Sequence, residues 1–129
     1  MARLALAGIA IGLALTAAAC GGGKKSYTLP ATKTCLVHRG AHMGGKLDFV
    51  AETATGGAFI GHLPDNFVTV VFGESETDAQ QLQLAYQRFA LPNVRADLGD
   101  VLRRYNNAVT LWHTHPSDDD LALVVGCLH

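Results

Sequence analysis

Apolar side chains recur at every third or fourth position after residue 75, which is the spacing of one helix face. Ser75 and Asp78 form an S-x-x-D capping pair, in which the hydroxyl accepts from free amides and the carboxylate favours the positive end of the helix dipole. The apolar stripe consists of Ala79, Leu82, Ala85, Tyr86 and Phe89. This pattern predicts a helix that is stopped by Leu91-Pro92-Asn93.

A second S-x-x-D pair, Ser117 and Asp120, predicts another helix near the end of the sequence. Consecutive aspartates fill its first turn, where each negative charge is favoured by about 0.3–1 kcal/mol. Its apolar stripe consists of Leu121, Val124, Val125 and Leu128. Gly126 is the weak point of this helix.

The segment from Pro30 to Arg39 favours a helix, with Thr28 as a possible cap and Gly40 placed to end it. Residues 34–38 are equally compatible with a strand, so both interpretations stay open. Residues 46–55 lie between the glycine pairs Gly44-Gly45 and Gly56-Gly57 and predict an irregular stretch.

Three strands are expected from runs of β-branched and aromatic residues. Ala58 to Leu63 and Phe67 to Gly73 flank the turn residues Pro64-Asp65-Asn66 and predict a hairpin. Ala108 to His113 alternates as a strand does. Residues 97–105 predict a further short helix instead. Its stripe consists of Leu98, Val101, Leu102 and Tyr105.

The expected order of the main elements is helix, strand, strand, helix, strand, helix. This order predicts a small α+β domain of two layers, in which the helices pack on one face of a short three-stranded sheet. If Phe67–Gly73 and Ala108–His113 are neighbours, the helix between them forms a right-handed crossover.

Composition limits the chain to one domain and excludes two classes of protein. The chain has 129 residues, and 10 Lys and Arg against 11 Asp and Glu leave no positive excess for binding phosphates. A nucleic-acid partner is therefore not expected. Disorder throughout is also excluded, because 49% of the residues are hydrophobic and the net charge is only -1.

The start of the chain differs from the rest. Arg3 is the only charge among the first 19 residues, and Leu4 to Ala19 is a charge-free run of 16 residues rich in Leu, Ala, Ile and Gly. A spanning helix needs roughly 20 apolar residues. A short run with a basic start and small residues at its end is typical of a secretory signal peptide.

The run ends at Ala17-Ala18-Ala19-Cys20, which resembles the lipobox of bacterial lipoproteins, with Ala17 where Leu is usual. The resemblance implies that residues 1–19 are removed and that Cys20 receives a diacylglycerol carrying fatty acids such as palmitate. Residues 20–27 are then a lipidated flexible tether, and residues 28–129 form a single domain. Membrane lipid is the expected partner, at the extracytoplasmic face in a periplasm or at the cell surface.

Ordinary secretion and an uncleaved membrane anchor remain alternatives to lipidation, because Ala17-Ala18-Ala19 also satisfies the A-x-A rule of signal peptidase. The cysteines favour lipidation. An exported protein with three cysteines has one thiol to explain, and acylation of Cys20 leaves Cys35 and Cys127 as a pair. We expect these two to form a disulfide in an oxidising compartment, with free buried thiols or a bond to a partner protein as alternatives.

Histidines raise a metal hypothesis. His113 and His115 form an H-x-H pair that would point both rings to one face of a strand, and His62 ends a neighbouring predicted strand. The string from His113 to Pro116 resembles the H-x-H-P core of JAMM-type zinc isopeptidases, in which an S-x-x-D supplies a third zinc ligand after a loop. Here Ser117–Asp120 follows without a loop, so no metal ligand and no catalytic residue is assigned.

We therefore expect a lipid-anchored accessory or binding domain that is not an enzyme and has no cofactor. The alternative is a metal-dependent hydrolase, or a metal-binding module, that uses His113 and His115. Trp112 either packs under a helix or marks an exposed contact surface.

Overall fold

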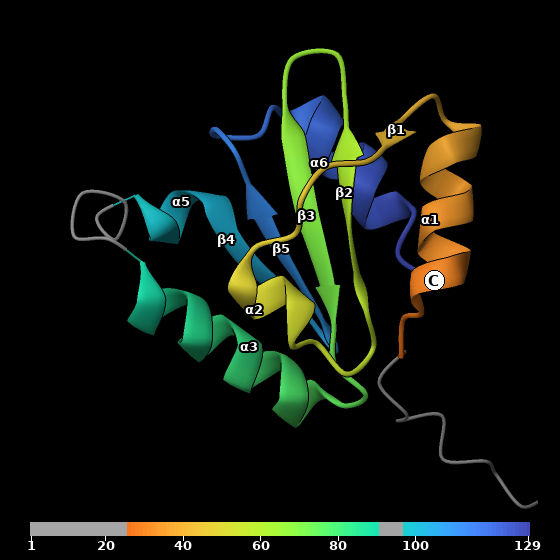
Figure 1. Ribbon diagram of the computed structural model, residues 1–129. Coiled ribbons are helices and arrows are strands. Elements are labelled where there is room, and N and C mark those ends of the chain that lie inside the picture. The colour runs from red at the N-terminus through yellow and green to blue at the C-terminus, as the bar shows by residue number, and fades with distance from the viewer. Residues whose placement is uncertain (1–25, 91–96) are drawn as a thin grey trace, which may run out of the picture.

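The computed structural model describes residues 26–90 and 97–129 and has an antiparallel sheet at its centre (Figure 1). The strand order is β1-β2-β3-β5-β4. The strands are β1 (His42–Met43), β2 (Ala58–His62), β3 (Phe67–Phe72), β4 (Leu102–Tyr105) and β5 (Ala108–Trp112). The described helices are α1 (Leu29–His38), α2 (Phe49–Glu52), α3 (Glu76–Phe89), α5 (Leu98–Val101) and α6 (Asp118–Gly126).

These elements make an α+β domain, as predicted, and local signals explain most of them. In α3, the amide of Asp78 donates to Ser75 Oγ at 3.1 Å. In α6, the amide of Asp120 donates to Ser117 Oγ at 3.1 Å. The hairpin of β2 and β3 and the strand β5 are confirmed. The segment that fitted either a helix or a strand is the helix α1, and Gly40 follows it with a φ of +94°, which favours glycine. Within the described residues, no helix has the length and apolar character needed to cross a membrane.

The prediction of a helix over residues 97–105 is wrong beyond Val101. There the chain turns into β4, and Leu102 pairs with Leu111 of β5. The two strands are joined by a tight turn at Asn106, whose φ of 51° is in the left-handed region that Asn tolerates. Together with β1, this strand makes the sheet five-stranded instead of three-stranded.

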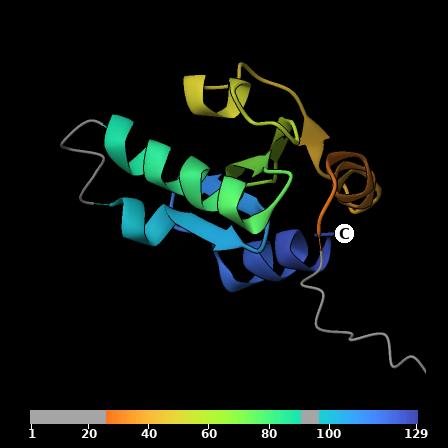
Figure 2. The same ribbon diagram turned by 90° about the horizontal axis from the view of Figure 1, so that it is seen from below.

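Helices cover both faces of the sheet, and not one face as predicted. The first face carries alternate residues of the strands, such as Val70 and Phe72, under α1 and α6. The second face carries Val71 and Val109 under α2, α3 and α5. Figure 2 shows α3 and α6 on opposite sides of the strands. The reason lies in β3, which is apolar at nearly every position and therefore needs cover on both sides.

The crossover prediction is also wrong. β3 and β5 are neighbours, but they are antiparallel, so the α3 connection does not form a parallel crossover unit. Trp112 of β5 is buried, with 2% of its surface exposed, and packs with the first-face core below α1 and α6.

The N-terminal part of the domain is fastened at three points. The predicted disulfide between Cys35 and Cys127 is present and joins α1 to the residue after α6. The amide of Thr28 donates to the carbonyl of His129 at 2.6 Å. The side chain of Asn107 holds the backbone of Tyr27, accepting from its amide at 2.6 Å and donating to its carbonyl at 2.7 Å.

Candidate functional site

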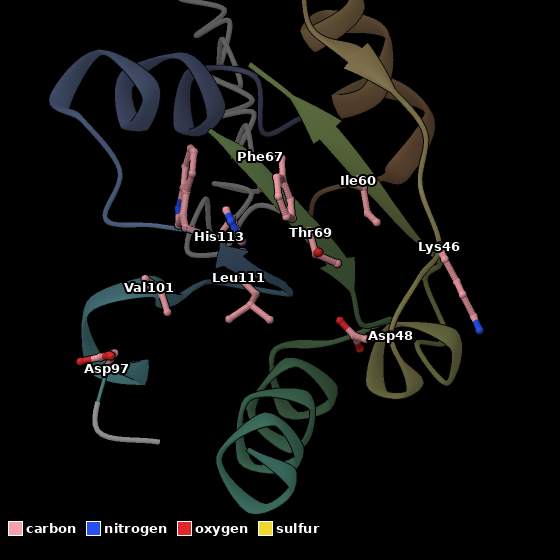
Figure 3. Close-up of a pocket in the computed structure, with 10 residues that line it drawn as sticks. Lys46, Asp48, Ile60, Phe67, Thr69, Asp97, Val101, Leu111 and His113 are labelled. Carbon is pink, nitrogen blue, oxygen red and sulfur yellow. The ribbon is translucent and has the colours of Figure 1, made fainter. Parts of the chain in front are cut away.

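The second face of the sheet is only partly covered. Helices α2, α3 and α5 pack over the part that contains Val71 and Val109, and a hollow of about 580 Å³ lies over the part nearer the β2–β3 turn (Figure 3). We call it the sheet hollow. Its floor is a row of Ile60, Thr69 and Leu111, which are register partners on β2, β3 and β5. Hollows of this size are typical of small-molecule sites.

A row of rings borders one end of the sheet hollow, and two of them, Phe67 and His113, line the hollow itself. Phe67 pairs with His62 across β2 and β3, with ring centroids 5.5 Å apart. On its other side, Phe67 stacks on His113 at 4.2 Å and an interplanar angle of 15°. The rings lie side by side because neighbouring strands are spaced by about 4.8 Å.

Polar groups stand around this floor, which is apolar except for Thr69. Lys46 and Asp48 come from the segment before α2, and Asp97 precedes α5. In Figure 3, the carboxylate of Asp48 and the side chain of Thr69 face the hollow, whereas Lys46 extends away from it. The hollow therefore combines a mainly apolar floor with a few separate hydrogen-bonding groups.

Asp48 is held in place by two donors. Its Oδ1 accepts from the amide of Ala51 at 2.8 Å, which caps α2. The hydroxyl of Tyr86, on α3, donates to its Oδ1 and Oδ2 at 3.1 and 2.9 Å. Burial, and then the nearby charge of Asp48, raise the pKa of Tyr86 well above its usual range. Tyr86 therefore remains a neutral phenol that donates to this carboxylate.

A second hollow, of about 280 Å³, adjoins the first, and we call it the aromatic hollow. Asp48 and Leu111 line both hollows. The outer wall is formed by Phe49 and Phe89, whose rings meet edge to face at 5.9 Å and 81°. These two rings are 68% and 61% exposed. Large exposed aromatic side chains beside a hollow indicate a surface that a partner or ligand can cover.

The structure separates the histidines of the H-x-H pair. His113 lies in the ring row of the sheet hollow, whereas His115 Nδ1 contacts Asp100 Oδ1 at 2.6 Å and lines a different, polar hollow. His62 Nε2 hydrogen bonds to the carbonyl of Gly44 at 2.7 Å. Across residues 26–90 and 97–129, no group of three or more His, Cys, Asp or Glu side chains could hold a metal ion. The described residues thus give the metal hypothesis no third ligand.

Three predicted features lie outside the described residues: Cys20 with its signal peptide, the tether as far as residue 25, and the stop of the long helix at Leu91-Pro92-Asn93. Sequence reasoning in turn missed the functional candidates Asp48 and Thr69. A signal was available for Asp48, because an aspartate before apolar residues is a common helix cap. No local signal distinguishes Thr69 from other strand residues.

Comparison with known proteins adds no relative. The chain matches no protein-family model, no curated protein and no solved structure.

Proposed function

We propose that this chain is an exported, lipid-anchored protein whose domain binds a small organic ligand in the sheet hollow. The observation that carries the binding role is the hollow itself. It has a floor on three adjacent strands that is apolar except for Thr69, and separate polar groups at its sides. A concave apolar surface with a few directed polar groups is the usual form of a ligand site.

Two observations support the anchor. The sequence before Cys20 resembles a lipobox, and the other two cysteines of the chain are already joined to each other. Cys20 is therefore the cysteine left for acylation. Two or three acyl chains on one residue are enough for stable membrane attachment.

The position of the hollow suits a tethered domain. Tyr27, where the described chain enters the domain, is bound to Asn107, which also donates to the carbonyl of Gly73 just after β3. Phe67 marks the other end of β3, about 17 Å away at 3.4 Å per residue. An anchored domain would thus hold the ring row at the end of the sheet opposite its attachment.

Mass spectrometry of the protein isolated from membranes tests the anchor. We expect a chain that begins at Cys20 and carries acyl groups, and we expect Cys20→Ser to release the protein from the membrane fraction. Ala17→Leu is the matched control, because it restores the usual lipobox residue and should leave the modification intact. An unmodified N-terminus, or an intact chain inside the cell, would overturn the anchor.

Nuclear magnetic resonance tests the hollow, with phenol, benzamide and N-methylacetamide as probes. We expect the chemical-shift changes to gather on Thr69, Leu111 and His113. Thr69→Tyr should abolish them by filling the hollow, whereas Thr34→Tyr, on the exposed side of α1, should leave them unchanged. Shift changes scattered over the surface, or changes that survive Thr69→Tyr, would refute the binding role.

A further inference from the structure

The sheet hollow and the aromatic hollow form one trough, because they share two lining residues. Asp48 lies at the junction and brings a negative charge to it. Besides Asp48 and the hydroxyl of Tyr86, which already donates to it, the described lining of the aromatic hollow is apolar. The trough therefore places a carboxylate between two apolar surfaces.

The carboxylate of Asp48 still has capacity to bind a donor. Its described partners are the amide of Ala51 and the hydroxyl of Tyr86, and neither carries a positive charge. A carboxylate has about four acceptor positions. Within the described residues it forms no ion pair, and Lys46, the nearest basic residue in sequence, extends away from the hollow in Figure 3.

The aromatic walls favour the same kind of ligand. Phe49 and Phe89 expose most of their surface next to this carboxylate. Aromatic faces attract organic cations and also cover apolar groups. An anionic ligand would be repelled by Asp48, and a neutral one would gain no attraction from its charge.

We infer that the trough binds an organic amine: its ammonium group contacts Asp48, its aryl or alkyl body fills the aromatic hollow, and any polar extension reaches Thr69. This inference rests on the proposed binding role and narrows it to a ligand class. Since Asp48 is held by Tyr86 and by the cap of α2, the charge is already in position before a ligand arrives.

Three matched probes test the inference: 3-phenylpropylamine, 3-phenylpropanol and 3-phenylpropionate. They share one body and differ in the charge of the head group. The protein is the chain from residue 20 onward with Cys20→Ser, which contains every described helix and strand. In a nuclear magnetic resonance titration, we expect the amine to bind about tenfold more tightly than the alcohol, and the acid to bind most weakly. The shift changes should gather on Phe49, Phe89 and Leu111.

Variants separate the charge from the apolar body. Asp48→Asn keeps an oxygen that can cap α2 and accept from Tyr86, and it should remove the preference for the amine. Asp65→Asn, an exposed carboxylate that lines neither hollow, is its control. Phe89→Ala should weaken both the amine and the alcohol, and the amine at least as much as the alcohol, whereas Leu84→Ala, exposed on the same helix, should weaken neither.

The outcomes distinguish this inference from the proposed function. Equal binding of all three probes in the trough, or an amine preference that survives Asp48→Asn, would overturn the amine class and leave the binding role standing. No binding of any probe in either hollow would overturn both. The lipid anchor is tested separately, by mass spectrometry of the N-terminal residue.

Discussion

Reduction of the disulfide between Cys35 and Cys127 is expected to lower the free energy of unfolding by several kcal/mol. The bond joins residues 92 positions apart. In the chain-entropy model, a closed loop of this length destabilises the unfolded chain by about 4.6 kcal/mol at 25 °C. Reduction should change the free energy of the folded state less, because α1 and α6 pack on the same face of the sheet and Thr28 stays bonded to His129. About 4.6 kcal/mol is therefore the upper limit of the loss.

Urea unfolding with and without a reductant measures this loss. Trp112 is the only tryptophan of the chain and is buried, so its fluorescence reports the transition. For a domain of about 100 residues, a loss near the upper limit lowers Tm by about 20 °C or more. In the double variant Cys35→Ala and Cys127→Ala, the reductant should have no effect. A loss below about 1 kcal/mol in the wild-type protein would refute the argument that this bond restricts the unfolded chain.

Three further substitutions test the hydrogen bonds of the domain. Tyr86→Phe removes the donor to Asp48 and should cost about 1.5–3 kcal/mol at pH 7. Because the pKa of Tyr86 is raised on folding, the greater stability of the wild-type protein should persist up to about pH 10 and shrink above it. Equal urea midpoints of the two proteins at pH 7 would contradict the expected loss of stability. Asn107→Ala removes both bonds to Tyr27 and should speed hydrogen exchange at the amide of Tyr27. Unchanged exchange would show that Asn107 is not needed to hold this segment on the domain. Ser117→Ala should cost about 1 kcal/mol by urea unfolding, and no loss would contradict its role as a cap.

Elements whose determinants lie within a few residues were predictable from the sequence. Both S-x-x-D pairs cap helices, and the turn at Pro64-Asp65-Asn66 joins two strands. A cap bonds to an amide three residues away, so the chain carries the whole signal locally.

The other elements depend on partners that are distant in sequence. The spacing of Leu98, Val101 and Leu102 fits a helix, but pairing with β5 draws Leu102 and the residues after it into a strand. β1 has two residues, too few for a period to be visible. The cover on both faces of the sheet, by contrast, did have a local signal, because β3 is apolar at nearly every position.

The arrangement of the candidate site could not be predicted from the sequence for the same reason, although His113 was a candidate residue. Asp48 and Tyr86 are 38 residues apart and meet only because α2 and α3 cover the same face. Phe67 and His113 stack because β3 and β5 are neighbours. The H-x-H pattern suggested that His113 and His115 act together, but the strand ends at Trp112 and the two rings diverge.

The fastening of α1 also determines how the domain bears a mechanical load. A pull on the segment before Tyr27 first meets the bonds to Asn107. If these open, the first turns of α1 can peel away only as far as Cys35, where a covalent bond transmits the force to the end of α6. In a lipid-anchored domain, a pulling force would therefore extend the tether and leave the strands of the sheet hollow undisturbed.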